Sequence, residues 1–115
     1  MRKNLSRRER LRGKAFLGRV FTASQKFTCP GVRFLMTING LDYNRVVVSS
    51  VRKYGSSVKR NRARRVGKEA YRCIKDRIKA GFDMAFILFP GDYSYAERIS
   101  QFSFLLKKAG LLDEP

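Results

Sequence analysis

The pattern of hydrophobic residues predicts several β-strands in the middle of the chain. Alternating and β-branched residues over 32–38 (VRFLMTI) and 45–51 (RVVVSSV) are typical of strands. The loop NGLDYN between them starts with an Asn-Gly turn signal, so we expect these two strands to form a hairpin. The apolar run 82–89 (FDMAFILF) predicts a buried strand, and a short edge strand at 25–29 is a weaker candidate.

Apolar residues recur with helical spacing near both ends of the chain. Ser-x-x-Glu capping boxes starting at Ser6 and Ser94 predict a first helix over about 6–21 and a last helix that Gly110 terminates. The predicted buried residues are Leu11, Ala15, Gly18 and Phe21 in the first helix, and Ala96, Ile99, Phe102, Leu106 and Ala109 in the last.

The longest predicted helix lies in the middle of the chain and has two chemically different faces. It begins after Ser56 or Ser57 and extends to about Lys79. One arc of this helix carries Ala63, Val66, Gly67, Ala70, Cys73 and Ile74. The opposite arc carries Arg60, Arg64, Arg65, Lys68, Arg72 and Lys75. We therefore expect the first arc to pack on the core and the second to face outward.

These elements predict a single α+β domain over residues 1–115, with residues 1–5 flexible. Their order is α-β-β-(β)-α-β-α, and the succession of strand, helix and strand over 45–89 is typical of a βαβ unit with parallel strands. With 43% hydrophobic residues, the chain can bury one core of its own.

The charge of the chain is strongly positive and unevenly distributed. It has 26 basic and 9 acidic residues, a net charge of +17. The segment 59–79 alone holds ten basic and two acidic residues, so the pairs of opposite charge that usually stabilise an exposed helix cannot form there. Arginine, which binds phosphate in a bidentate manner, outnumbers lysine in this segment. The basic arc therefore favours a nucleic-acid partner, with an anionic membrane surface as the second choice.

The residues that most often perform protein catalysis or bind metals are scarce. The chain has no histidine, its nine carboxylates are scattered, and its two cysteines, Cys29 and Cys73, lie far apart. We therefore expect no catalytic residue and no metal site in the protein, and we expect both cysteines to be reduced thiols. The sequence contains no apolar run of about 20 residues and no secretory signal, so we expect a cytoplasmic protein without a membrane partner.

The segment 55–72, GSSVKRNRARRVGKEAYR, resembles the signature of the protein subunit of bacterial ribonuclease P. In that family a basic strand end and a glycine precede an Arg-Asn-Arg core, which spaced basic residues and a Glu-Ala-aromatic ending follow. The matching residues here are Arg52, Lys53, Gly55, Val58, Arg60, Asn61, Arg62, Arg65, Lys68, Glu69, Ala70 and Tyr71. The resemblance extends to the opening segment RRERLRGKAFLGRVF and covers about residues 6–110.

The resemblance implies a fold and a function. The fold is a mixed four-stranded sheet with a left-handed βαβ crossover, a ribosomal-protein-S5-like topology that runs against the usual handedness. The function is that of the protein component of ribonuclease P, an endoribonuclease that removes the 5′ leader of precursor tRNA by hydrolysis. The implied partners are the catalytic RNA subunit and precursor tRNA, without an obligate protein partner. The RNA performs the chemistry, and Mg²⁺ is bound mainly by the RNA.

Two groups of site residues follow from the resemblance and from the basic arc. The predicted RNA-binding residues are Arg52, Lys53, Arg60, Asn61, Arg62, Arg64, Arg65, Lys68 and Arg72. The residues predicted to line a cleft for the single-stranded leader, between the sheet and the first helix, are Leu17, Phe21, Phe34 and Met36.

Two other functions are compatible with the basic helix. A general RNA-binding or ribosome-associated module needs only the basic face and the fold, and would not depend on the leader. A membrane-surface protein would use the basic amphipathic helices to bind anionic lipids, although the Arg-Asn-Arg spacing gives that hypothesis no support.

Overall fold

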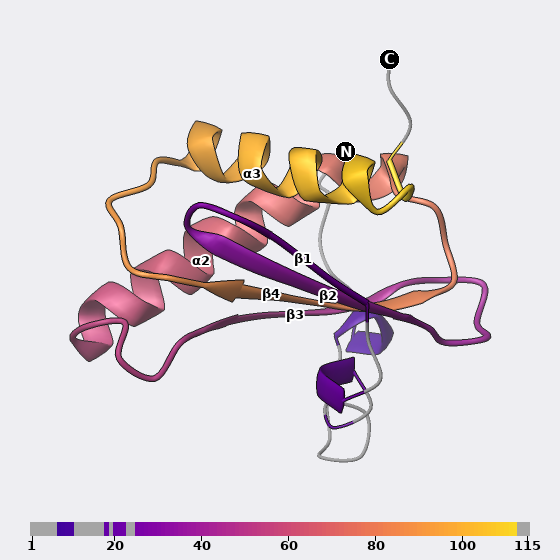
Figure 1. Cartoon of the computed structure of the whole chain (residues 1–115), viewed down its shortest axis with the longest axis horizontal. Helices are drawn as coiled ribbons and strands as arrows, with labels where there is room; N and C mark the ends of the chain where they lie inside the picture. Colours follow the sequence, from indigo (N-terminus) through magenta and orange to yellow (C-terminus); the bar gives the residue numbers. More distant parts are fainter. Residues whose placement is uncertain (1–6, 11–17, 19, 23–24, 113–115) are drawn as a thin grey trace.

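The chain forms a four-stranded sheet with two α-helices on one of its faces (Figure 1). The computed structural model describes residues 7–10, 18, 20–22 and 25–112. The described elements are, in chain order, η1 Arg7–Glu9, β1 Gln25–Cys29, β2 Val32–Ile38, β3 Arg45–Ser50, α2 Ser57–Ile74, η2 Lys75–Arg77, β4 Phe82–Leu88 and α3 Tyr95–Lys108. The predicted flexible segment 1–5 and the hydroxyl of the predicted Ser6 capping box lie outside the described residues.

The sheet is mixed, as the α+β prediction requires. Its strand order is β1-β2-β4-β3, with β4 antiparallel to β2 and parallel to β3. The weakest predicted strand, β1, is present and pairs with β2 in an antiparallel hairpin around Pro30 and Gly31. Gly31 has a φ of 92°, a conformation that favours glycine in this turn.

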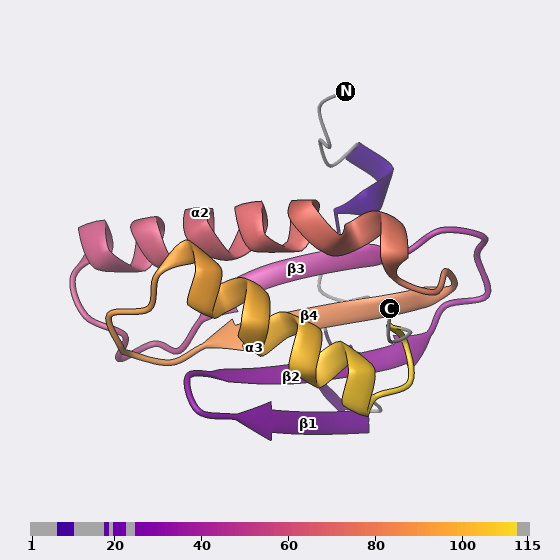
Figure 2. The ribbon, with the colours of Figure 1, turned by 90° about the horizontal axis from the view of Figure 1, so that it is seen from above.

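The crossover from β3 through α2 to β4 is left-handed, which confirms the predicted handedness. In Figure 2 the helices lie toward the viewer, β3 and β4 both run from right to left, and α2 returns from left to right. Looking along the two strands from this side, β4 lies to the left of β3. A right-handed crossover would put β4 on the other side.

The predicted hairpin between 32–38 and 45–51 is wrong, because β4 lies between these two strands. Strand β4 is apolar on both faces and buried over most of its length, which suits a central position. The loop after β2 spans the width of β4 and is tied to the start of that strand. Asn44 accepts a hydrogen bond from the backbone of Phe82, and the backbone of Asn39 donates to the carbonyl of Gly81.

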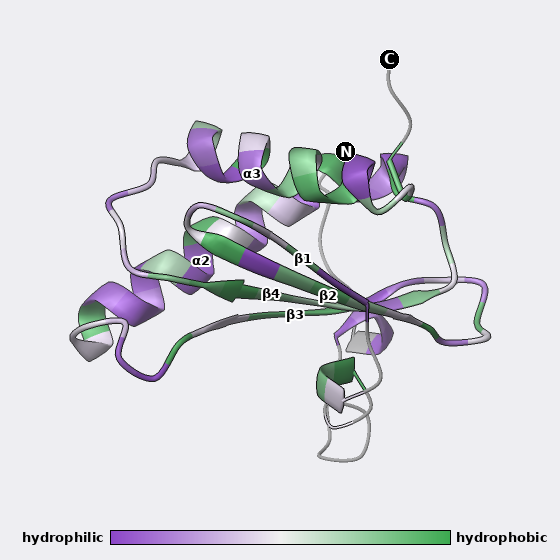
Figure 3. Cartoon of the chain, in the orientation of Figure 1, coloured by the Kyte–Doolittle hydropathy of each residue, from purple (hydrophilic) through white to green (hydrophobic). Residues whose placement is uncertain are grey.

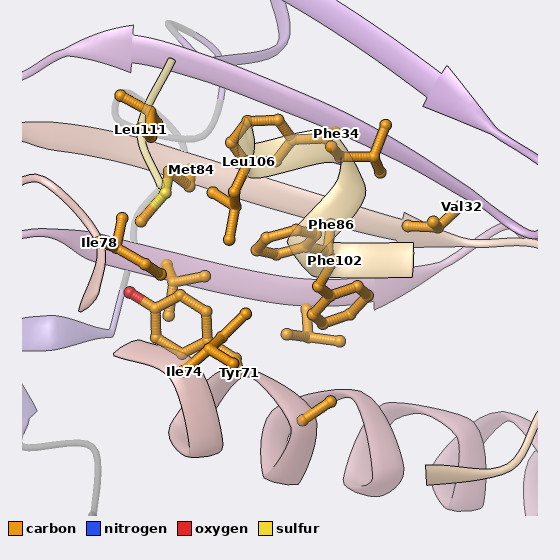
Figure 4. Packing of buried hydrophobic residues seen from close by; sticks show 14 of the residues in the cluster. Val32, Phe34, Tyr71, Ile74, Ile78, Met84, Phe86, Phe102, Leu106 and Leu111 are labelled. Carbon is orange, nitrogen blue, oxygen red and sulfur yellow. The ribbon is translucent and has the colours of Figure 1, made fainter. Parts of the chain in front are cut away.

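The core lies between the sheet and the two helices, with Phe86 of β4 at its centre (Figure 4). The ring of Phe86 stacks on Phe34 of β2 at 4.8 Å and on Phe102 of α3 at 4.0 Å between centroids. Tyr71 of α2 contributes a third, tilted ring at 6.0 Å. Burial raises the pKa of the Tyr71 hydroxyl, so this phenol stays neutral in the core.

Helix α2 packs on the sheet along a stripe of small residues. A Cβ atom on Gly67 would lie 2.8 Å from Val48 of β3 and 3.3 Å from Leu88 of β4, so the helix backbone approaches the sheet closely here. This packing accounts for a glycine in the helix interior, where it costs about 1 kcal/mol relative to alanine. The buried residues of the helix are Ala63, Gly67, Ala70, Tyr71 and Ile74.

The ends and the buried stripe of α2 differ partly from the prediction. Ser56 is the N-cap, since its hydroxyl accepts from the backbone of Lys59, but the α-helix ends at Ile74 and continues only as the 3-10 turn η2. The prediction that Cys73 lies in the core is wrong, because this residue is exposed, whereas Tyr71 on the same helix is buried.

Helix α3 begins with the predicted capping box. Ser94 accepts from the backbone of Glu97, and the Glu97 carboxylate accepts from the backbone of Ser94, which lowers the pKa of Glu97. The predicted stripe is partly wrong, because Ala96 is exposed whereas Arg98 is buried. The fully buried residues of the helix are Arg98, Phe102, Leu105 and Leu106, while Ile99 and Ala109 pack at the edge of the core.

The predicted continuous helix over 6–21 is also wrong. Arg10 forms a parallel β-bridge with Val46, because the outer edge of β3 offers backbone groups that need partners. The carboxylate of Glu9 accepts from Lys75 at 3.1–3.2 Å, and the capping box predicted between Glu9 and Ser6 stays a prediction because Ser6 lies outside the described residues. Among the described residues of this segment, Gly18 and Val20–Thr22 are also helical, and Val20 packs on the sheet face opposite α2 and α3 (Figure 1).

A buried ion pair joins the first residues of β3 and β4. Arg45 donates to both carboxylate oxygens of Asp83 at 2.8 Å, and Asn39 donates to the same carboxylate at 3.0 Å. The hydrogen bond to Asp83 raises the pKa of Arg45. The partners of Asp83, Asn39 and Arg45, are distant from it in the sequence. The ion pair therefore depends on the tertiary structure and could not be predicted from the residues around Asp83.

Replacing Gly67 by valine tests the close packing of α2. We expect Gly67→Val to lower the free energy of unfolding by about 1–3 kcal/mol, because the new methyl groups overlap Val48 and Leu88. Urea unfolding followed by circular dichroism measures the change. Lys68→Val is the matched control, since it introduces the same β-branched residue at the adjacent, exposed position. Equal unfolding midpoints for the two variants would contradict the close approach.

Candidate nucleic-acid interface

The outward face of α2 presents the predicted basic residues as one surface. Asn61, Arg62, Arg65 and Lys68 are exposed, whereas Arg60, Arg64 and Arg72 are half-buried and lie at the sides of the helix. In Figure 3 much of α2 is hydrophilic, in contrast to the mostly hydrophobic β3 and β4 beneath it. We call these seven residues the basic face of α2.

The start of α2 is unusually rich in positive charge. Its first turn has no acidic residue, although Lys59 and Arg60 lie there at the positive end of the helix dipole. Arg52 and Lys53 are exposed in the turn that leads into the helix. In the free protein, repulsion between these cations and the positive end of the helix dipole both raise the electrostatic free energy. A bound anion lowers it, because the anion attracts both the cations and the positive end of the dipole.

Side chains within the basic face orient one another. Arg64 donates to the side-chain oxygen of Asn61, so the asparagine within the Arg-Asn-Arg core holds a neighbouring guanidinium in place. Arg60 donates to the hydroxyl of Ser57 at 3.4 Å. Arg72 forms an ion pair with Glu69 at 2.9 Å, and this carboxylate neutralises part of the charge at the far end of the face.

Two of the residues predicted to line the leader cleft lie instead in the core. Phe34 is fully buried and Met36 is 7% exposed, and both belong to the cluster between the sheet and the two α-helices. The prediction that these side chains face the first helix is therefore wrong. Phe21 is 38% exposed, and its role in leader binding stays a prediction. Leu17 lies outside the described residues.

The residues that do face the N-terminal segment occupy the alternate positions of the strands. Val20 packs with Leu35 of β2 and Ala85 of β4, and the half-buried Val47 and Ile87 border this cluster. We call this second side of the sheet its open face. The strand period of two leaves two choices of face for β2, and Phe34 and Met36 lie on the face that enters the core, not on the face toward the N-terminal segment.

Protein groups suited to metal binding or catalysis do not gather in the described part of the chain. No group of three or more His, Cys, Asp or Glu side chains is close enough there to hold a metal ion. Neither Cys29 nor Cys73 forms a disulfide bond. The expectation that the protein supplies no catalytic residue stays a prediction.

The fold and the basic face together define a small α+β domain with a positively charged helix on its surface. The family model for ribonuclease P matches residues 5–110, nearly the whole chain. The chain therefore belongs to the ribonuclease P protein family. The protein components of this family work with an RNA subunit in an endoribonuclease holoenzyme that takes part in tRNA 5′ processing.

Relatives and solved structures agree with the family. The chain is 38% identical over 77 residues to the ribonuclease P protein component of Alkaliphilus oremlandii, covering 65% of this chain and 68% of that protein. It is 33% identical over 87 residues to the same component of Thermotoga petrophila, covering 76% and 74%. The structure of the RNase P protein from Thermotoga maritima has a TM-score of 0.78 at 26% identity, covering 87% of this chain and 96% of that chain. The structure from Staphylococcus aureus, at 20% identity and a TM-score of 0.80, covers 91% and 98% and supports the fold alone.

Truncating Phe34 and Phe21 tests which sheet face holds the core. We expect Phe34→Ala to lower the free energy of unfolding by about 3–5 kcal/mol, because it leaves a cavity beside Phe86. The exposed Phe21→Ala should change the same quantity by about 0.5 kcal/mol or less. Thermal unfolding of both variants measures the difference. A stable Phe34→Ala protein would show that the ring does not support the core.

Proposed function

We propose that this chain is the protein component of ribonuclease P and binds the catalytic RNA subunit through the basic face of α2. The observation that carries the proposal is the separation of charge on α2. Its buried stripe holds small and apolar residues, and its outward face holds arginine and lysine with Glu69 as the nearest acidic partner. A folded RNA supplies closely spaced phosphates for such a face.

The arrangement of the basic face suits phosphates along an RNA backbone. Arg62, Arg65 and Lys68 follow one another at intervals of three residues, so they lie along about two turns of one side of the helix. Arginine forms paired hydrogen bonds with phosphate oxygens, and the backbone amides at the start of α2 add to the attraction for anions.

The proposal assigns the 5′ leader of precursor tRNA to the open face of the sheet. Single-stranded RNA needs basic groups for its phosphates and apolar or aromatic groups for its bases. The open face offers the half-buried Val47 and Ile87 and the exposed Arg33, whose guanidinium lies 5.6 Å from the ring of Phe89. Phe21, exposed beside Val20, adds an aromatic side chain.

In this proposal the RNA subunit performs the hydrolysis and binds most of the Mg²⁺. The carboxylates that the fold fixes in place already have structural partners. Asp83 pairs with Arg45, Glu9 pairs with Lys75, and Glu97 caps α3. The described residues therefore provide no ligand set that fits Mg²⁺, and we assign no chemical step to the protein. In this proposal the protein reduces the electrostatic repulsion between the catalytic RNA and precursor tRNA, and it holds the 5′ leader.

A membrane-surface function receives no support from the structure. Within the described ranges, no helix is long and apolar enough to cross a membrane. The apolar stripe of α2, which a membrane-surface helix would insert into lipid, is already buried against the sheet.

Reconstitution with the cognate RNA tests the proposed function. The protein alone should not cleave precursor tRNA, whereas adding it to the RNA at low Mg²⁺ should restore cleavage. The holoenzyme should also bind precursor tRNA more tightly than mature tRNA, because only the precursor has the leader. No gain over the RNA alone would contradict the proposal. Equal affinity for the two tRNAs, with cleavage restored, would favour a general RNA-binding module.

Single charge removals test the basic face. We expect Arg62→Ala and Lys68→Ala each to weaken binding of the catalytic RNA by roughly ten-fold, since each loses a charge-assisted contact with phosphate. Lys107→Ala is the matched control, because it removes one exposed lysine from α3, away from this face. Filter binding measures the affinities. Identical losses in the Lys68 and Lys107 variants would mean that only the total charge matters.

The salt dependence of binding gives an independent estimate of the number of phosphates bound. If about 6–10 phosphates are contacted, affinity for the catalytic RNA should fall by roughly 10³–10⁵ between 50 and 200 mM salt, on the scale known for duplex DNA. Titrations at several salt concentrations measure the slope. An affinity that does not change over this range would exclude a mainly electrostatic interface.

A further inference from the structure

A separate cleft lies beside the start of α2. Its volume is about 770 Å³, and it is formed by the first turns of α2, the loop between β4 and α3, and the start of α3. Its polar and aromatic lining includes Tyr54, Lys59, Arg62, Tyr93, Tyr95 and Arg98. The volume falls within the range of pockets that hold small organic ligands.

A buried cation that donates its hydrogen bonds to neutral groups lies in this cleft. Arg98 is 1% exposed, and it donates to the carbonyl of Gly31 at 2.9 Å and to the side-chain oxygen of Gln101 at 3.0 Å. Its guanidinium also lies 4.5 Å from the ring of Tyr93. Tyr54 also interacts with this guanidinium, and burial lowers the pKa of Arg98. Since burying a charge among mostly neutral groups is costly, an anion bound in the cleft would lower the electrostatic free energy of the protein.

The lining of the cleft carries a positive excess. Lys59, Arg62 and Arg98 supply three cations, and Asp92 is the one carboxylate among the described lining residues. Lys59 and Arg62 also belong to the helix that carries the basic face, so the cleft is continuous with the surface that we assign to RNA.

Three tyrosines give the cleft its aromatic character. Tyr54 is held by a hydrogen bond from its hydroxyl to the carbonyl of Gly91 at 3.3 Å. Tyr93 is held by Arg98 and by close packing on Gly31, where a Cβ atom would come within 2.6 Å of the ring. Tyr95 is 46% exposed at the first position of α3. The side chain of Tyr95 is hydrogen-bonded to Cys73 of α2, so all three rings are held in place and that of Tyr95 is also accessible to solvent.

We propose that this cleft receives an unpaired nucleotide of the RNA that lies along α2, with its base against Tyr95 and its phosphate between Lys59 and Arg62. A simple anion would need the cations but not the tyrosines, whereas a nucleotide uses both. A base within a duplex has no free face for stacking, so the nucleotide is unpaired. The identity of this RNA as the catalytic subunit rests on the proposed function.

Removing one exposed aromatic ring tests the stacking contact. We expect Tyr95→Ala to weaken binding of the catalytic RNA by roughly ten-fold, and Tyr95→Phe to stay within about two-fold of the unmodified protein. Phe104→Ala is the matched control, because Phe104 is an equally exposed aromatic residue of α3 (53%) that does not line the cleft. Equal affinities for Tyr95→Ala and Phe104→Ala would overturn the proposal.

A titration of the unmodified protein with small ligands tests the cleft without mutation. Nuclear magnetic resonance should show shifts at Tyr54, Tyr93 and Tyr95 with nucleoside monophosphates, and much smaller shifts with inorganic phosphate at the same concentration. Shifts of equal size with inorganic phosphate, or no shifts at the tyrosines, would overturn the proposal. If the protein restores cleavage but these tests fail, the cleft proposal alone is wrong. If cleavage is not restored, the proposed function is wrong, and the titration still decides whether the cleft binds a nucleotide.

Discussion

The close approach of α2 to the sheet is the constraint on which the rest of the structure depends. Because Gly67 has no side chain, the helix backbone lies against Val48 and Leu88, and its neighbours in the stripe complete the core with Tyr71, Phe86 and Phe102. Once this stripe is buried, the arginines and lysines of the opposite arc lie on the outward face or at the sides of the helix. The packing of the core and the presentation of positive charge are therefore consequences of one helix orientation.

The two faces of the sheet have different tasks. One face, with Phe34 and Phe86, is closed by the two α-helices, whereas the open face meets only the N-terminal segment in the described part of the chain. Inserting β4 between β2 and β3 makes this division possible, since β4 contributes apolar residues to both faces. The buried pair of Arg45 and Asp83 fixes β3 against β4 at one end of the sheet. The result is a packed core that leaves one face of the sheet and one face of α2 uncovered by the two α-helices.

The concentration of positive charge on α2 is unfavourable for the isolated domain. Neighbouring cations repel one another, the helix dipole opposes Lys59 and Arg60, and Arg98 is buried among neutral partners. Each of these unfavourable contributions to the electrostatic free energy becomes smaller when phosphate binds nearby. A protein of the ribonuclease P family that works with an RNA subunit can therefore be expected to gain stability on assembly, because the partner neutralises the charge that the free protein must tolerate.

Features that depend on neighbours along the chain can be predicted from the amino-acid sequence. The strand segments, the Ser56 and Ser94 caps and the basic arc of α2 all follow from local periodicity and local hydrogen bonds, and the structure confirms them. Which strand lies at the centre of the sheet and which face of β2 enters the core became clear from the folded chain alone, because both depend on pairing between distant segments. For the same reason, the bridge at Arg10 and the cleft around Arg98 could not be predicted: their partners are brought together only when the sheet and helices pack.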